Sequence, residues 1–332
     1  MRPVPLSLGL FELERGQGAF LSSGAVTLPA VLTPAFDSFT ASWNADTPPG
    51  TAVEVLGRVR RFEAWSDWFS FGRWSAEGGT SVERSSEHEF MDIDTLRLRA
   101  LDSKADAVQL RAVLYTTNRS TSPTIFLLSA SVADRAAPLA PETGWTAGPW
   151  VRDLDVPGRS QMTEQARFAR DICSPASLSM AMAFWGRSPL TADTAAAVQD
   201  RRTKKYGDWP FNTAWAARSG LRAWVSYLDS IAGLQDEIAA GFPVVVSISF
   251  EAGGLDGSPL KRTRGHLLVV RGFTSFGDVI VNDPAAPDAS TTRRVYRREQ
   301  FRKAWLGNKQ GLAYLLRPRW PADLALGTNT AD

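Results

Sequence analysis

The chain contains one cysteine and two histidines, so few side chains are available for nucleophilic chemistry. Cys173 stands in the stretch DICSPASLSMAMAFWG (171–186), at the predicted start of a helix. The positive end of a helix dipole favours a thiolate, and its unpaired N–H groups can stabilise an oxyanion. Free cysteine is also among the most buried residue types. From this stretch alone, Cys173 is either a small buried side chain or a nucleophile.

The helix after the cysteine is predicted from its two ends and its apolar face. Ser174 suits the N-cap, and Pro175 suits the first helical position, where its missing N–H costs nothing. Gly186 is suited to end the helix. One apolar face is formed at helical spacing by Leu178, Ala181, Met182 and Trp185. We therefore expect a core helix with Cys173 at its edge.

A histidine and an aspartate are predicted to face each other. His266 opens the strand HLLVVRGF, and the strand DVIVNDP follows it. A hairpin that turns at residues 273–276 would set His266 directly opposite Asp283, within reach of a hydrogen bond. Asp283 would then orient the imidazole, whose free nitrogen would accept the Cys173 proton, as acyl transfer requires. The alternative is a His–Asp pair with a purely structural role, and His88 in SSEHEF is expected at the surface.

Other chemistries find little support in the sequence. One cysteine and two distant histidines do not build a zinc site, and no G-x-S-x-G motif indicates a serine hydrolase. A net charge of +2 gives no reason to expect nucleic acid. No apolar run reaches the roughly 18 residues of a membrane helix. We therefore expect no metal, no organic cofactor, no nucleic-acid partner and no membrane span.

The length of 332 residues predicts two domains, and the pattern changes between the two halves. After an N-terminal extension (1–20), residues 21–135 alternate apolar and polar positions between turn-forming clusters, which predicts an all-β sandwich or jelly roll. The segment AAPLAPETGWTAGPW (136–150) has neither period and is interpreted as a linker.

Residues 151–320 predict an α+β domain, and residues 321–332 a C-terminal tail. Apolar strands follow the helices in this half, in FPVVVSISF, HLLVVRGF, DVIVNDP and GLAYLLRP. The helices are expected at residues 174–185, 191–201, 212–219 and 232–240.

Several segments of the second half occur in a recognisable order. They are Gln161, the cysteine helix, KKYGDWPFNTAWAARSGL (204–221), AAGFPVVVSISF (239–250), GHLLVVRGF, VIVNDPAA and REQFRKAW (298–305). Together they resemble the bacterial cysteine peptidase-like domains related to the bacteriocin-processing, double-glycine-leader peptidases (family C39-like) of the papain-like superfamily. The resemblance runs from about residue 150 to 318 and implies a papain-like cysteine peptidase fold.

This resemblance also implies a reaction. Cys173 would be the nucleophile, His266 the general base and Asp283 the orienting acid, while Gln161 would donate an N–H to the oxyanion hole beside the backbone N–H of Cys173. A peptide or protein would be hydrolysed through a thioester acyl-enzyme. Relatives commonly carry glycine after the cysteine, and here Ser174 occupies that position, where it can alter access to the site.

Two other functions remain open at this stage. One is an acyltransferase or transamidase that uses the same triad. The other is a non-catalytic protein that retains the fold and binds a carbohydrate or cell-wall polymer through its β-domain. The first half resembles a β-sandwich found ahead of such peptidase domains, in residues 39–55 and 65–74. A binding platform could be formed by Trp43, Trp65, Trp68 and Trp74, which otherwise pack in the core.

Residues around the expected cleft complete the sequence-based hypotheses. Trp209 and Phe211 in GDWPFN either line the cleft with Ser174 or pack internally. The basic run in LKRTRGH either attracts an acidic substrate or forms a solvated face; its members are Lys261, Arg262 and Arg264.

No signal peptide is predicted, because prolines and a glycine interrupt the first apolar stretch, MRPVPLSLGLFELERGQG, and glutamates follow it. The expected compartment is cytoplasmic, or extracellular or periplasmic for a chain trimmed at its N-terminus.

Overall fold

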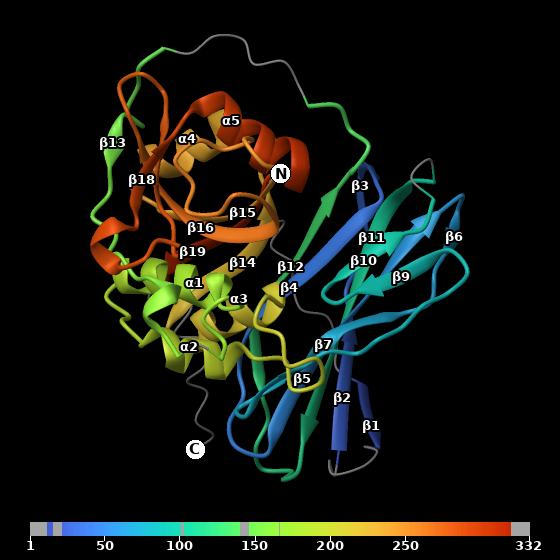
Figure 1. Ribbon diagram of the computed structural model, residues 1–332. Coiled ribbons are helices and arrows are strands. Elements are labelled where there is room, and N and C mark those ends of the chain that lie inside the picture. Colours follow the sequence, from blue (N-terminus) through green and yellow to red (C-terminus); the bar gives the residue numbers. More distant parts are fainter. Residues whose placement is uncertain (1–11, 16–21, 101–102, 140–145, 166, 320–332) are drawn as a thin grey trace.

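The computed structural model describes most of the chain in two packed regions (Figure 1). The described residues are 12–15, 22–100, 103–139, 146–165 and 167–319. The predicted C-terminal tail, the centre of the predicted linker and most of the predicted N-terminal extension lie outside them.

The N-terminal region consists of two antiparallel sheets. The larger sheet contains β1 (Glu12–Arg15), β2 (Ser22–Thr27), β3 (Val31–Phe36), β5 (Thr51–Arg61), β6 (Ala64–Trp65), β7 (Phe69–Ser75), β8 (Gly78–Thr80) and β11 (Ala105–Thr116). The smaller sheet has the order β12-β4-β10-β9, from Thr124–Ala133, Ser38–Asp46, Thr95–Leu98 and Glu89–Asp92. Apolar residues alternate along most of these strands, so each sheet has one face to bury against the other.

Aromatic side chains fill the space between the two sheets. Phe39 of β4 meets Phe71 of β7 edge to face, with ring centroids 4.9 Å apart. Trp43 and Trp74 are fully buried in the same core. Trp65 and Trp68 instead flank the guanidinium of Arg58, whose Cζ lies 4.8 and 4.6 Å from their ring centroids. The interpretation that these tryptophans pack internally holds for Trp43 and Trp74, and their burial excludes the alternative of a binding platform that uses all four rings.

The C-terminal region consists of a third antiparallel sheet with helices on both faces (Figure 1). The strands are β14 (Leu221–Tyr227), β19 (Leu312–Pro318), β15 (Val244–Phe250), β16 (Thr263–Phe273), β17 (Val279–Asn282) and β18 (Arg293–Tyr296) in spatial order, and β13 (Arg152–Asp153) pairs with β16. The helices are α1 (Cys173–Phe184), α2 (Thr191–Val198), α3 (Trp209–Arg218), α4 (Ile231–Ala239) and α5 (Arg298–Arg302). Short helical segments lie at Gln161–Thr163, Ala289–Thr291 and Lys303–Gly307.

The four predicted helices of this region are present, whereas β14 and β18 are additional strands that the sequence analysis did not predict. Helices α1, α2 and α3 lie on one side of the sheet, and α4 and α5 lie on the other (Figure 1). Gly186 follows α1 in the left-handed conformation (φ +73°), which glycine adopts at little cost and which ends the helix.

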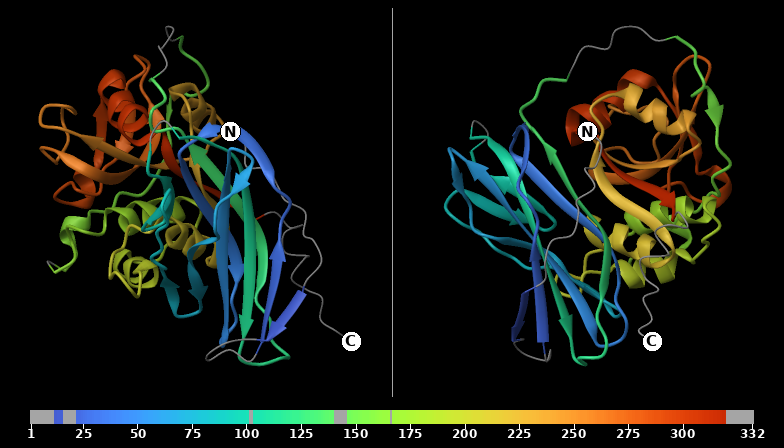
Figure 2. Two further views of the ribbon diagram at one scale, coloured as in Figure 1. Left: turned by 90° about the vertical axis from the view of Figure 1, so that its right-hand side faces the viewer. Right: turned by 180° about the vertical axis from the view of Figure 1, so that it is seen from behind.

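The edge strand β14 is covered by the N-terminal region. Asn44 of β4 donates from Nδ2 to the Ala223 carbonyl (2.6 Å) and accepts from its N–H at Oδ1 (3.1 Å). Ser42 of β4 accepts from the N–H of Val225 in the same way (3.1 Å). Edge strands expose unpaired backbone groups, and here polar side chains of the other sheet satisfy them. The two regions therefore pack as one unit (Figure 2).

One aromatic ring of α3 crosses the boundary between the regions. Phe211 is fully buried, with ring centroids 6.1 Å from Trp43 and 5.8 Å from Trp74. The backbone of Gly79 on β8 packs directly against this ring, and a Cβ at that position would be only 2.4 Å from the nearest ring atom. A glycine is thus required where the ring enters the core of the N-terminal region.

Within the described part of the chain, the helices are all too short or too polar to cross a membrane.

Candidate active site

Cys173 is the first residue of α1 and is half-buried. The N-cap position is Ile172, which makes no capping side-chain bond, so the prediction that Ser174 is the N-cap is wrong. Ser174 is already inside the helix and is buried; its Oγ donates to Oδ1 of Asn212 (2.9 Å) and lies 3.0 Å from the hydroxyl of Tyr314. Ser174 therefore packs behind the cysteine and does not line an open surface.

His266 on β16 and Asp283, just after β17, are in direct contact: Nε2 of the imidazole lies 2.7 Å from Oδ1 of the carboxylate. The predicted register is nevertheless wrong. Phe273 pairs with Val279, so the turn is longer than expected, and the register shifts again within β16. Asp283 reaches the imidazole from beyond the end of the paired strand rather than from the opposing position.

Asp283 is fully buried and has three hydrogen-bond donors. Besides His266, Oδ1 accepts from the N–H of Ala285 (2.9 Å), and Oδ2 accepts from the hydroxyl of Tyr296 on β18 (2.6 Å). Burial alone would raise the pKa of this carboxyl, but the His266 charge and these donors outweigh burial and hold the pKa below its ordinary value. Asp283 is therefore a carboxylate at neutral pH.

The imidazole also interacts with the cysteine thiol, and each of the two groups shifts the pKa of the other. Because Nε2 contacts Asp283, Nδ1 is the ring nitrogen left to face the Cys173 sulfur. Burial would lower the pKa of His266, yet the Asp283 charge and hydrogen bond and the sulfur raise it to about 10.

The cysteine thiol responds in the opposite direction. Burial would raise its pKa, but the hydrogen bond and charge of His266, together with the backbone N–H of Leu267, lower it. These opposite shifts favour the thiolate–imidazolium pair relative to the neutral thiol and imidazole.

Gln161 lies next to this group, at the start of a short 3₁₀ helix, and is buried. Its backbone N–H donates to the carbonyl of Pro284 (2.8 Å), directly after Asp283, and its Nε2 donates to the carbonyl of Ala169 (2.7 Å). The loop before the cysteine and the segment after the aspartate are thus joined through one glutamine. One N–H of its amide is engaged, and the second has no partner among the described residues.

The two aromatic residues of GDWPFN have different environments. The prediction that Phe211 lines the cleft is wrong, since its ring lies in the core of the N-terminal region. Trp209 is half-buried and borders a cavity of about 390 Å³ between the two regions. Its backbone N–H donates to Oδ2 of Asp94 from the N-terminal region (2.7 Å). Of this pair, only Trp209 is placed to meet a ligand.

The other predicted positions lie at the surface. His88 is exposed, as expected. The basic run ahead of His266 is also exposed at Lys261, Arg262 and Arg264.

Three residues that hold the site were missed by the sequence analysis: Tyr296, Tyr314 and Asn212. No spacing rule connects them to the cysteine, because each reaches the site from a different element of the sheet or helix layer.

The comparisons with known proteins agree with this architecture. Residues 153–312 match the model of the Peptidase_C39 like family, and residues 14–133 match the model of the Peptidase C39 N-terminal domain. The second half of the chain is therefore similar to the Peptidase_C39 like family, and the first half to the N-terminal domain of Peptidase C39. The two-domain organisation and the family predicted from the sequence are confirmed.

The other comparisons add less. No curated protein matches the chain. One solved structure is described as a double glycine motif protease from an AMS/PCAT transporter in complex with the leader peptide. It is 20% identical, with a TM-score of 0.35, over 50% of this chain and 94% of that one. A likeness of this size carries no argument about this chain.

Proposed function

We propose that this protein is a cysteine peptidase of papain-like fold that hydrolyses peptide bonds. Cys173 is the nucleophile, His266 the general acid and base, and Asp283 the residue that orients the imidazole. The observation that carries the proposal is the buried Asp283–His266 contact (2.7 Å) together with the interaction of the same imidazole with the Cys173 thiol at the start of α1. Nucleophile, base and orienting group in contact are the requirement for nucleophilic acyl transfer.

The reaction follows from the ion pair. The Cys173 thiolate attacks the carbonyl carbon of the scissile bond, and the carbonyl oxygen takes the negative charge. The C–N bond then breaks as the His266 imidazolium gives its proton to the leaving amine, which leaves a thioester on the sulfur. His266 next accepts a proton from water as the water attacks the thioester, and the carboxylic acid product departs with return of the thiolate.

Gln161 is proposed to complete the oxyanion hole. The backbone N–H of Cys173, at the N-terminus of α1, is one donor, and the second amide N–H of Gln161 is the other. Two bonds fix the glutamine in place before substrate arrives, at Ala169 and Pro284. A donor held in advance stabilises developing charge without reorganisation.

The chain offers a direct test, because Cys173 is its only cysteine and thiol labelling reports this residue alone. We expect iodoacetamide to alkylate Cys173 faster than it alkylates a free thiol, and to do so well below the ordinary thiol pKa. In His266→Ala the thiolate loses its cation, so the alkylation rate near neutral pH should fall at least tenfold. Mass spectrometry of the intact protein against pH measures both rates.

The outcomes separate the possible functions. Alkylation no faster than for a free thiol and independent of His266 would contradict the nucleophile assignment and favour a non-catalytic binding protein. If the thiol is activated, peptide cleavage in the presence of an added amine separates two enzyme classes: free acids indicate a hydrolase, and amides indicate a transamidase. Cys173→Ala should abolish either product.

A further inference from the structure

A polar cavity of about 390 Å³ lies at the boundary between the N-terminal domain and the peptidase domain. The N-terminal domain lines it with the turn between β9 and β10, which carries Asp92 and Ile93, and with Arg97. The peptidase domain contributes Trp209, at the start of α3, and Lys309. We call this space the junction cavity.

Two segments that line the junction cavity are also close to residues adjacent to the candidate active site. The Lys309 ammonium lies only 3.7 Å from the point where a Cβ on Gly265 would stand, and Gly265 immediately precedes His266. On the opposite wall, Trp209 begins the helix whose Asn212 hydrogen-bonds with the residue after the cysteine. A peptide lying across Cys173 and His266 could therefore place one of its groups in this cavity.

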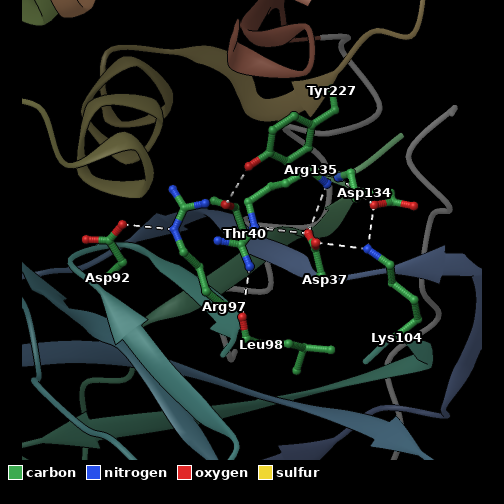
Figure 3. Close-up of polar contacts among 10 residues, drawn as sticks. Asp37, Thr40, Asp92, Arg97, Leu98, Lys104, Asp134, Arg135 and Tyr227 are labelled. Carbon is green, nitrogen blue, oxygen red and sulfur yellow. Dashed lines mark hydrogen bonds and ion pairs between the residues drawn. The ribbon is translucent and has the colours of Figure 1, made fainter. Parts of the chain in front are cut away.

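The charges in the cavity are not balanced. Arg97 is paired with Asp92 (2.8 Å), and Arg135 is paired with Asp37 (3.1 Å), as Figure 3 shows. Lys309 forms no hydrogen bond or ion pair with any residue that the structure describes. Partial burial and then the charge of Arg97 lower its pKa, and Asp92 offsets this only in part. Asp94 also lines the cavity, but its carboxyl accepts from the N–H of Trp209 and burial raises its pKa to about 7. One cation in the cavity, Lys309, thus has no direct ionic partner among the described residues.

The backbone around the cavity is strained on both sides. Ile93 (φ +61°) and Gln310 (φ +51°) occupy the left-handed region, and both border the cavity. Such conformations are costly for residues other than glycine and cluster where a site must be held in shape. The two turns that face each other across the cavity are therefore held in place rather than relaxed.

We propose that the junction cavity is a substrate subsite of the peptidase and that it receives a carboxylate of the peptide, with Lys309 as the ionic partner. The carboxylate is either an aspartate or glutamate side chain or the C-terminus of the peptide. The exposed basic residues ahead of His266 add a long-range attraction for the same charge; they are Lys261, Arg262 and Arg264. This inference rests on the proposed function, because it assumes that substrate crosses Cys173.

Haloacetyl peptides test the subsite without requiring a known substrate. The probes are chloroacetyl-(Gly)n-Glu-amide and chloroacetyl-(Gly)n-Gln-amide, with spacers of different length n, and each alkylates Cys173. Glu and Gln have the same shape, so the ratio of their second-order alkylation rates measures charge recognition alone. A second pair, chloroacetyl-oligoglycine as free acid and as amide, tests the C-terminal carboxylate.

We expect the acidic member to react at least tenfold faster for at least one spacer length, and the ratio to fall to near one in Lys309→Met. Lys303→Met is the matched control, since Lys303 is an exposed lysine on the preceding short helix and should leave the ratio unchanged. The pair that shows the preference identifies the source of the carboxylate.

Rate ratios near one for every spacer in the unmodified protein would overturn the subsite, as would a preference that survives in Lys309→Met. These ratios are independent of the absolute reactivity of the thiol. Loss of the subsite with a reactive, His266-dependent thiol therefore refutes only this inference, whereas an unreactive thiol refutes the proposed function.

Discussion

Two of the buried carboxyl groups of the peptidase domain, Asp283 and Asp208, have opposite pKa shifts. Asp283 receives three hydrogen bonds and an imidazolium neighbour, and its pKa is lowered. Asp208, the N-cap of α3, receives one bond, from the N–H of Phe211 (3.3 Å), and its Oδ2 has no partner among the described residues. Burial and the nearby carboxyl of Asp94 raise the pKa of Asp208 well above its ordinary value.

The opposite pKa shifts of Asp283 and Asp208 have different causes. Both are equally hidden from water, so burial does not separate them; their neighbours do. The donors around Asp283 stabilise its negative charge, and this charge raises the pKa of His266. Asp208 and Asp94 face each other with too few donors for two charges. Burial raises the pKa of both carboxyls, so the pair retains a proton to higher pH than ordinary aspartates do. Asp94 also connects the two domains, because it accepts a hydrogen bond from the N–H of Trp209 at the start of α3.

The largest effect on activity is expected from removing the negative charge of Asp283. Asp283→Asn keeps the shape but leaves His266 without its counter-charge, so the pKa of His266 should fall and that of Cys173 should rise. We expect kcat/KM for a peptide substrate to drop by roughly 10²- to 10⁴-fold. The pH dependence of Cys173 alkylation should move toward that of an ordinary thiol, which mass spectrometry can follow.

Asp236→Asn is the matched control, because it makes the same substitution at an exposed position on α4. It should leave both measurements unchanged. If Asp283→Asn retained the alkylation profile of the unmodified protein, the contrast between the two buried acids would lose its functional meaning.

The contact of Asp283 with His266 also shows how far the sequence could reach. The nearness of the two residues was predictable, because two apolar strands joined by a short turn bring their outer ends together. The register of β16 against β17 was not predictable. The turn at Thr274–Gly277 and the register shift near Arg271 depend on backbone hydrogen bonds that no local pattern specifies. The donor from Tyr296 comes from a strand that the sequence analysis did not predict.

The second prediction concerns the joint between the domains. Phe211→Ala removes a fully buried ring from between Trp43 and Trp74, which should lower the free energy of unfolding by about 3–5 kcal/mol. Urea denaturation measures the loss. Phe276→Ala is the control, since that ring is 80% exposed and its removal should change stability by less than about 0.5 kcal/mol. A small effect of Phe211→Ala would show that the domains do not depend on this joint.

The role of Phe211 illustrates what sequence alone could not supply. Its neighbours in GDWPFN suit a cleft-lining loop as well as a helix start, and Asp208 and Pro210 do begin α3. The partners of the ring are Gly72, Gly79 and two tryptophans more than 130 residues away in the chain. Long-range packing across a domain boundary leaves no periodic signal, so the elements were predictable and their docking was not.

The third prediction tests the protonated state of the second acid cluster through its dependence on pH. The pKa of Asp94 is raised to about 7, mainly by burial, whereas an unfolded chain has an aspartate pKa of about 3.9. Between pH 4 and 7 the unfolded chain releases this proton and the folded protein keeps it. Stability contributed by the protonated carboxyl therefore falls as pH rises through this window.

Asp94→Asn cannot ionise, and its amide can still accept from the N–H of Trp209 while donating toward Asp208. Relative to the unmodified protein, this variant should gain stability as pH rises from 4 to 7, by up to about 4 kcal/mol, and should match it near pH 4. Urea unfolding of the pair at pH 4.5 and pH 7.5 measures the difference, with Asp236→Asn expected to show none. A variant that is less stable than the unmodified protein at pH 7.5 would mean that the fold stabilises the Asp94 carboxylate and does not raise the pKa of this group. Asp94 and Asp283 would then both be buried carboxylates whose charge is stabilised by neighbouring donors.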